Sequence, residues 1–206
     1  MVPSFVKARE IVVSPQTELI PLPADGQSRH IAFSKFTFSI PKGQVWGKIK
    51  AGLLCGPFQP LVWDEGKIRM DKDSFTTVFQ TELEKAGFSV IARNDRLFDE
   101  PDRVAADYLI GATIVEASAK LCAAWASFGD FDQIKGDIEL AMEWQIYSRQ
   151  QRRVVVAIVS RGGIEQAHFT KGGAGGLFNE VFKTHIHQFA NSPQFRNLIV
   201  VGKEGD

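Results

Sequence analysis

The clearest hydrophobic pattern in the chain is a strict alternation over residues 137–147. Five apolar side chains fall on one face of this stretch, and acidic or amide side chains fall on the other. A repeat of two residues is typical of a β-strand with one buried face. A polar run over 148–152 and a β-branched stretch over 153–160 follow. The pattern therefore predicts a hairpin.

Residues 107–121 also favour a β-strand, with Tyr108, Ile110 and Ile114 on one face. Together with the hairpin, this strand predicts an antiparallel meander of three consecutive strands. The strand over 153–160 is apolar on both faces at its centre. We therefore expect it to lie inside a sheet rather than at an edge.

A second hairpin is predicted in the N-terminal half. Residues 30–40 alternate, but their apolar side chains change face near Ser34 and Lys35, as a β-bulge would cause. A Pro-Lys-Gly-Gln turn leads to a strand over 45–54. That strand is expected to place three side chains on one face: Trp46, Lys48 and Lys50.

Two helices and a short third one are predicted around these strands. Residues 73–88 carry an apolar stripe between a capping Asp73 and a terminating Gly87, and a strand over 88–92 follows. A second stripe at helical spacing covers 177–189, and Pro193 begins a final short helix. The predicted fold class is α+β: a mixed, mostly antiparallel sheet built from hairpins, with two main helices packed on it as an α/β sandwich.

Proline and glycine positions suggest how the chain is divided. Residues 1–30 hold four of the nine prolines and are expected to form an extended arm with a short strand over 10–13. Residues 31–201 are expected to form a single α+β domain, and 202–206 a disordered tail. Length and a hydrophobic content of 44% suffice for one sizeable core.

Charge and hydropathy disfavour two classes of partner. The 24 basic residues equal the 24 acidic ones, so no excess of positive charge is present to neutralise nucleic-acid phosphates. No apolar run approaches the roughly 18 residues of a membrane span. The first 30 residues also lack the charged and apolar segments of a signal peptide.

The two cysteines, Cys55 and Cys122, leave two interpretations open. One disulfide would indicate an oxidising compartment. Two buried thiols would act as small apolar side chains. Sequence alone does not decide whether the two residues come close enough to be bridged.

One glycine-rich run and three histidines are candidate ligand sites. The glycine-rich run 171–176 looks like a phosphate cradle but matches neither the P-loop nor the dinucleotide fingerprint. With Gly162 and Gly163, it is better explained as the border of a flexible linking segment. His185 and His187, with His168 as a third candidate, could be metal ligands. On a helix, however, the side chains of His185 and His187 point about 200° apart and cannot bind one ion, so no metal site is expected. A partly buried His185 and a surface His187 are favoured.

Catalytic residues do not stand out. No nucleophile elbow is present, and Glu139 and Glu143 alternate along a strand face as solvated side chains would. We therefore expect no catalytic residues, no cofactor and no enzymatic activity.

The sharpest candidate for a contact surface is a stretch of aromatic residues with glycine and aspartates over 123–132. Its aromatic members are Trp125, Phe128 and Phe131. Aromatic side chains on a loop can anchor a partner or a ligand. They can equally fold back over one end of the sheet as a plug, which is the favoured alternative.

Three phrases carry a family resemblance: Ala-Gly-Phe-Ser-Val-Ile over 86–91, Ala-Asp-Tyr-Leu-Ile-Gly-Ala-Thr-Ile over 106–114, and Trp-Gln-Ile-Tyr-Ser over 144–148. In this order, over about 31–189, the chain resembles bacterial envelope accessory proteins of the CsgG and LpoB type. The resemblance implies an α/β sandwich that works through protein contacts in the periplasm. The chain departs from the pattern in having no lipobox cysteine, so a lipid anchor is expected only if a signal segment has been removed.

The leading hypothesis is thus a non-enzymatic, lipoprotein-like envelope domain, periplasmic or associated with the outer membrane, that binds protein partners or assembles with itself. The alternative is a domain that binds a small molecule or glycan through the 125–131 loop. A cytoplasmic location is the alternative compartment.

Overall fold

The computed structural model describes residues 8–14, 17–52, 54–63, 72–91, 105–124 and 133–201. In these ranges the chain forms a mixed sheet, a small two-stranded ribbon and three helices. The elements in chain order are β1 Arg9–Val12, β2 Gln27–Ser28, β3 Ile31–Phe38, β4 Val45–Ala51, β5 Phe58–Val62, α1 Lys72–Lys85, β6 Tyr108–Ala123, β7 Gln133–Ser148, β8 Arg153–Lys171, α2 Gly173–Asn191, α3 Pro193–Ile199 and β9 Val200–Val201.

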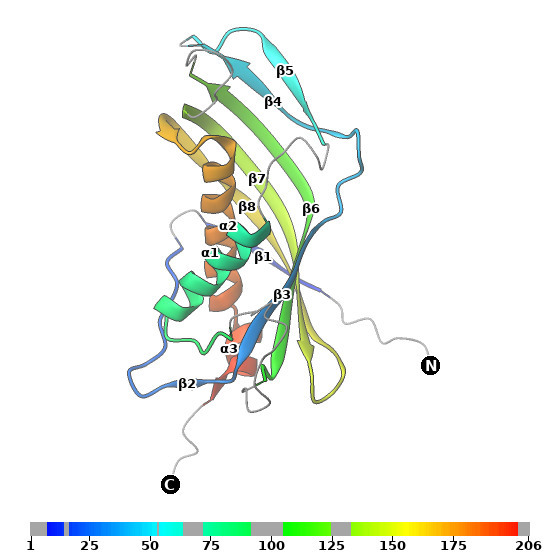
Figure 1. Cartoon of the computed structure of the whole chain (residues 1–206), viewed down its shortest axis with the longest axis vertical. Coiled ribbons are helices and arrows are strands. Elements are labelled where there is room, and N and C mark those ends of the chain that lie inside the picture. The colour runs from blue at the N-terminus through cyan, green and yellow to red at the C-terminus, as the bar shows by residue number, and fades with distance from the viewer. Residues whose placement is uncertain are drawn as a thin grey trace, which may run out of the picture.

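The sheet is built around the predicted meander. Strands β6, β7 and β8 pair antiparallel along nearly their whole lengths, which confirms the three strands and the turn between Ser148 and Arg153. Strand β8 lies between β7 and β1, so its predicted interior position is also confirmed. The long strands coil along the length of the molecule, with the β4–β5 hairpin at one end (Figure 1). The predicted α+β class with a mixed sheet is confirmed.

The predicted hairpin between residues 30–40 and 45–54 is wrong. Strand β3 runs parallel to the first half of β6, from Tyr108 to Ile114, and β4 runs parallel to its last third, from Ala119 to Ala123. The two strands therefore follow one another along the same edge of β6. Strand β4 instead forms its hairpin with β5, in which Pro60 is paired with Lys48.

Two bulges set which side chains face the core. The bulge predicted near Ser34 is present between Phe33 and Lys35, and it directs Phe33 and Phe36 to the same buried face. A second irregularity between Val45 and Gly47 was not predicted. There Trp46 turns into the core, with 5% of its surface exposed, while the following lysines stay outside. The expectation that Trp46 shares a face with them is therefore wrong.

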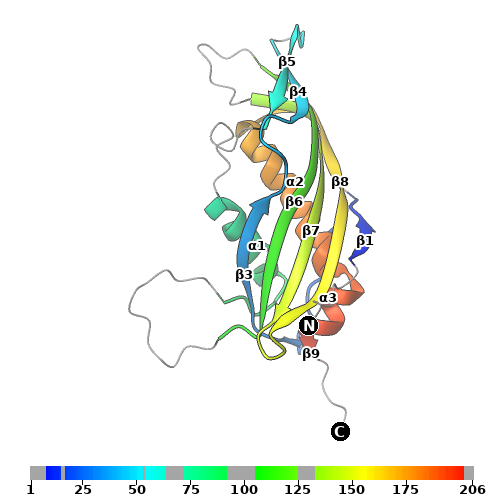
Figure 2. The same cartoon turned by 90° about the vertical axis from the view of Figure 1, so that its right-hand side faces the viewer.

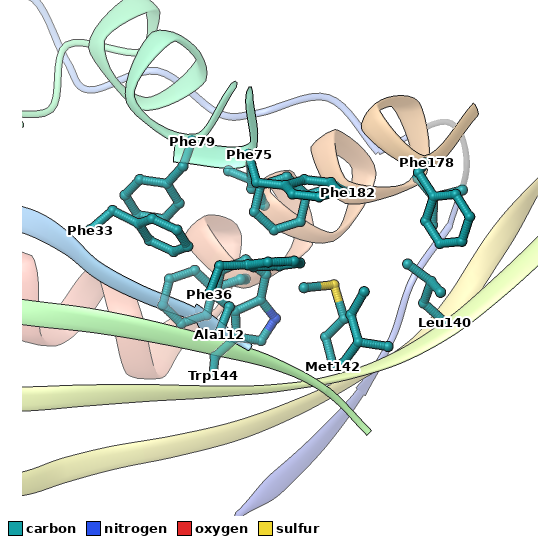
Figure 3. Packing of buried hydrophobic residues seen from close by; sticks show 14 of the residues in the cluster. Phe33, Phe36, Phe75, Phe79, Ala112, Leu140, Met142, Trp144, Phe178 and Phe182 are labelled. Atoms are coloured by element: carbon teal, nitrogen blue, oxygen red, sulfur yellow. The ribbon is translucent and has the colours of Figure 1, made fainter. Parts of the chain in front are cut away.

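All three helices lie on one face of the sheet, and the aromatic core fills the space between (Figure 1 and Figure 3). Phe79 on α1 stacks on Phe33 of β3 at 4.5 Å between ring centroids. Trp144 of β7 stacks on Phe189 of α2, also at 4.5 Å. The helix predicted over 73–88 is confirmed, and its chain reverses at Gly87 with φ 87°. The strand predicted over 88–92 is reduced to one bridge, from Val90 to Ile31.

The linking segment predicted between Gly162 and Gly176 is wrong. Strand β8 continues through Gly162 and Gly163 to Lys171, and α2 begins directly at Gly173. A Cβ atom on Gly163 would lie 2.0 Å from the carbonyl oxygen of Ile138 on β7. Glycine is therefore required inside the strand because the neighbouring backbone comes too close for a side chain.

The described residues 8–14 and 17–28 lie along the domain surface. Strand β1 adds to the outer side of β8, and β2 pairs with β9 after α3. Between them, Leu22 donates its backbone N–H to Ala86 at the end of α1. The predicted start of α3 at Pro193 is confirmed. Ser192, the residue before it, caps the helix, because its hydroxyl accepts a hydrogen bond from the Phe195 N–H.

Candidate functional site

The face of the sheet opposite the helices is uncovered over the described residues (Figure 2). Because strand side chains alternate, residues of β6 with even numbers from 108 to 114 are buried under the helices, whereas those between them face outward. Near the β7–β8 turn this face is hollowed into an open depression of about 470 Å³. We call it the β3–β6–β7 depression; its outward side chains include Lys35, Thr37, Leu109, Thr113, Gln145 and Tyr147.

The depression combines apolar and hydrogen-bonding groups. The hydroxyls of Thr37 and Thr113 lie 2.8 Å apart across β3 and β6, which fixes both side chains on its floor. Leu109 and Tyr147 face one another in register on β6 and β7. This arrangement can bind an apolar or mixed surface, with one amine at Lys35 as its charged group.

A second hollow, of about 390 Å³, lies on the same face toward the β4–β5 end. Four lysines from three strands line it: Lys48, Lys50, Lys120 and Lys135. The strand register explains their proximity, because Lys48 is paired with Lys120, and Lys50 and Lys135 are both paired with Cys122. Asp137 and Glu165 also line the hollow. Asp137 lies 3.3 Å from the ammonium of Lys120.

The disulfide lies within this lysine-lined hollow. Cys55 and Cys122 are bridged, with 5.6 Å between their Cα atoms, and the described residues contain no free cysteine. Of the two interpretations of the cysteines, the disulfide is therefore the one confirmed. Disulfides persist in secreted, periplasmic and cell-surface proteins and are rare in a reducing cytosol. The bridge thus favours an extracytoplasmic compartment.

Beside the lysines, the β4–β5 hairpin exposes large apolar side chains. Val45 is 59% exposed and pairs with Val62, which is 44% exposed. Phe58 is 64% exposed and pairs with Lys50. At the end of the hairpin, Leu54 is 95% exposed.

A serine and a histidine contact each other under α2. Ser160 and His185 are both fully buried, and the serine Oγ lies 2.7 Å from His185 Nδ1. Trp144 Nε1–H donates to the same serine oxygen, and His185 Nε2 lies 3.1 Å from the Gly162 carbonyl. A neutral imidazole that donates through Nε2 and accepts at Nδ1 satisfies every partner. Burial lowers the pKa of His185 to about 4, although the hydrogen bond to Gly162 opposes this shift.

His187 was predicted to lie at the surface, and that prediction is wrong. Its side chain is 12% exposed, with Nε2 2.7 Å from a carboxylate oxygen of Glu82 and Nδ1 3.0 Å from the Thr17 carbonyl. Burial raises the pKa of Glu82, but hydrogen bonds from His187 and Lys85 and the charge of Lys183 outweigh it, so that this pKa is lowered overall. The histidine therefore joins α2 to α1 and to the N-terminal segment.

The other predicted site residues are divided between described and undescribed parts of the chain. Trp125, Phe128 and Phe131 lie outside the described residues, so the contact loop stays a prediction. His168 is exposed on β8, away from the buried partners of His185. Sequence alternation placed Lys48 and Lys50 on one face, but nothing in the sequence indicated that Lys120 and Lys135 would lie beside them.

Fold and surface together define the class of this chain as an α+β sandwich with one internal disulfide. Over the described residues, helices cover one face of its sheet and leave the other face open. No family model matches the sequence, and no curated protein matches it. In the described residues, no helix is long and apolar enough to cross a membrane, and no group of three or more potential ligands is arranged to hold a metal ion.

Among solved structures, the chain is similar to a Xanthomonas campestris protein of family DUF330, at 14% identity and a TM-score of 0.40, covering 88% of this chain and 94% of that one. It is also similar to a hypothetical protein of Chlamydia trachomatis, at 11% identity and a TM-score of 0.39, covering 82% and 92%. A third is a putative neuraminyllactose-binding hemagglutinin homologue from Helicobacter pylori, at 10% identity and a TM-score of 0.30, covering 87% and 92%. None of these three is described as a CsgG or LpoB protein.

Proposed function

We propose that this chain is a non-enzymatic domain of the bacterial cell envelope that binds a protein partner, or a second copy of itself, through the β3–β6–β7 depression. The observation that carries this proposal is the contrast between the two faces of one sheet. One face is covered by α1 and α2, whereas the other presents Leu109 and Tyr147 in an open hollow of about 470 Å³. An open face with aromatic and aliphatic side chains is typical of a protein contact rather than of an enclosed substrate site.

The disulfide supports the envelope location. Cys55 and Cys122 are separated by 67 positions and meet only in the folded chain. A bridge of this kind forms in the periplasm or outside the cell, where thiols are not kept reduced. The resemblance to CsgG- and LpoB-type proteins points in the same direction.

Burial of the serine–histidine contact supports a non-enzymatic role. A nucleophile and its base need access to a substrate, whereas Ser160 and His185 have no exposed surface. The pair is thus better explained as a polar contact that orients α2 on the sheet.

The experiment is site-specific photo-crosslinking in the native cells. A crosslinker at Tyr147, in the depression, is expected to capture one discrete protein or a second copy of this chain. The matched control is a crosslinker at Glu84, exposed on α1, which is expected to capture none. Equal products at both positions, or none at Tyr147, would contradict the proposal.

A loss-of-contact variant separates binding from folding. Leu109→Glu adds a charge to the open face and is expected to abolish the crosslink while leaving the melting temperature nearly unchanged.

Fractionation with thiol trapping during lysis tests the compartment. A periplasmic or membrane fraction without trapped thiols is expected, and a cytosolic protein with two trapped thiols would exclude the envelope location.

A small molecule or glycan is the second candidate for the depression, because its volume falls in the range of ligand pockets, roughly 300–1,000 Å³. Native mass spectrometry of protein isolated from its own cells discriminates the two. A bound species of low mass that Leu109→Glu releases would favour the ligand, and unliganded protein with a Tyr147 crosslink would favour the protein partner.

A further inference from the structure

The β4–β5 end of the molecule presents a surface that the proposed protein contact does not use. It combines an apolar edge with a basic band behind it, and we call it the tip surface. Its apolar side chains are Leu54, Phe58 and Val45, and its basic side chains are Lys48, Lys50 and Lys120. The tip surface lies at the opposite end of the long strands from the β7–β8 turn (Figure 1 and Figure 2).

Strand pairing places the two kinds of side chain on one side. Phe58 is paired with Lys50 and Pro60 with Lys48, so these four side chains share the helix-free face. Lys48 is in turn paired with Lys120 on β6. From the outer strand inward, the surface therefore changes from apolar to basic within three neighbouring strands.

The turn that carries Leu54 is held in place. Cys55 is bridged to Cys122 of β6, and Gly52 donates its backbone N–H to the Ala123 carbonyl at 3.0 Å. Within the turn, the Cys55 N–H donates to the Gly52 carbonyl at 3.0 Å. Residues on both sides of the almost fully exposed Leu54 are thus bonded to β6, and the leucine side chain does not fold back onto the domain.

The charges of the basic band are only partly compensated. Four lysines line the hollow behind the apolar edge, against two carboxylates, Asp137 and Glu165. The whole chain has no net charge, so this excess is local. The complementary partner is therefore an anionic surface.

Addition of a further strand to this edge is disfavoured. Pro60, in the middle of β5, has no N–H to donate to a neighbouring strand. Val45, Phe58 and Pro60 line one open hollow of about 390 Å³ together with Lys48 and Lys120, and this hollow is not an enclosed groove for a peptide helix. An open apolar surface in front of a basic band instead matches the interfacial binding of a lipid bilayer, where apolar groups enter the headgroup boundary and lysines contact anionic headgroups.

We infer that the tip surface docks the domain on an anionic membrane, with Leu54 and Phe58 at the acyl boundary and the lysines at the headgroups. This peripheral contact is separate from the β3–β6–β7 depression and does not depend on the protein contact proposed for it.

The test is co-sedimentation of the purified full chain with vesicles. Wild-type protein is expected to bind vesicles with about 40% phosphatidylglycerol in phosphatidylcholine and not vesicles of phosphatidylcholine alone. The double variant K48Q/K50Q is expected to weaken binding by about fivefold for each lysine. Leu54→Ser is expected to weaken binding by about tenfold. Because the Leu54 side chain is exposed, the variant is expected to keep the wild-type melting temperature, which a melting curve checks.

Matched controls remove the same charge and apolar area elsewhere. R149Q/R153Q deletes two positive charges at the far β7–β8 turn, and Val12→Ser removes an exposed aliphatic side chain on β1. Both are expected to bind vesicles as the wild type does. The inference is overturned if wild-type protein binds neither kind of vesicle or both equally, or if R149Q/R153Q weakens binding as much as K48Q/K50Q. Binding of an acidic protein at the tip without any vesicle binding would also overturn it.

Discussion

The hydroxyl oxygen of Ser160 lies 2.7 Å from Nδ1 of His185, and neither side chain has any exposed surface. The serine proton is donated to Nδ1, while the serine oxygen accepts from Trp144 Nε1–H at 2.9 Å. The neutral histidine thereby completes a chain of hydrogen bonds from β7 through β8 to α2. A proton added at Nδ1 would break it.

This relationship predicts that the domain loses stability in mild acid. Burial lowers the pKa of His185 to about 4 in the folded protein, from an ordinary value of 6.5. Above pH 6.5 the histidine is neutral in both states and adds no pH dependence. Between pH 6.5 and 4 the unfolded state binds the extra proton, so the free energy of unfolding falls by about 1.4 kcal/mol per pH unit. Urea denaturation at pH 7 and pH 5 is expected to differ by about 2 kcal/mol.

The variant His185→Gln isolates this effect. Glutamine keeps a donor and an acceptor but does not titrate in this range. The variant is expected to be less stable than the wild type at pH 7, with a smaller change between pH 7 and pH 5. An unchanged pH dependence in the variant would show that other groups cause it.

Removal of the disulfide is expected to lower stability. The bridge closes a loop of 67 positions, for which the chain-entropy model gives about 4 kcal/mol. The double variant Cys55→Ser and Cys122→Ser should therefore unfold at a lower urea concentration than the oxidised wild type. Reduced wild-type protein should match the variant, and equal midpoints for oxidised and reduced protein would contradict the prediction.

Replacement of two glycines by alanine is expected to change the free energy of unfolding in opposite directions. At Gly163 the new Cβ would lie 2.0 Å from the Ile138 carbonyl oxygen, so β7 and β8 must separate, and a loss of roughly 2 kcal/mol or more is expected. At Gly175, in the first turn of α2, nothing lies within 4 Å of the added atom. Alanine there should stabilise the protein by up to about 1 kcal/mol, because it restricts the unfolded chain. Thermal denaturation of both variants measures the contrast.

The contacts of His187 with Glu82 and Thr17 are expected to hold residues 17–28 against the helices. Both ring nitrogens face oxygen acceptors, at 2.7 Å on Glu82 and 3.0 Å on Thr17. His187→Ala is expected to leave the Glu82 carboxylate without this partner and to cost about 1–3 kcal/mol. Hydrogen exchange should rise over residues 17–28 before it rises in the long strands.

Lys85→Ala provides the control for this prediction. Lys85 also contacts Glu82, at 3.1 Å, but its side chain is 66% exposed. Exposed ion pairs contribute little, typically below about 1 kcal/mol. Hydrogen exchange over 17–28 should therefore stay unchanged in Lys85→Ala, and an equal increase in both variants would argue against an anchoring role of His187.

The sequence by itself determined the meander, the helices and the fold class. Period-two alternation defines β6 and β7 because one face of each strand is buried, and a β-branched run over 153–160 defines the first part of β8. Gly87 ends α1 because its positive φ suits glycine. These patterns depend only on residues close together in the sequence, so they can be recognised without knowledge of the fold. The buried stripe of α2 was predicted for the same reason.

Only the tertiary structure decided which strands meet. The sequence favoured a hairpin between β3 and β4, but both instead pair parallel with β6, a choice between distant partners that no local pattern encodes. The same long-range pairing bridges Cys55 to Cys122 and brings Lys120 and Lys135 beside Lys48. The open face, the lysine-lined hollow and the tip surface arise from register between strands separated by many residues, and for this reason the candidate site emerged only from the folded chain.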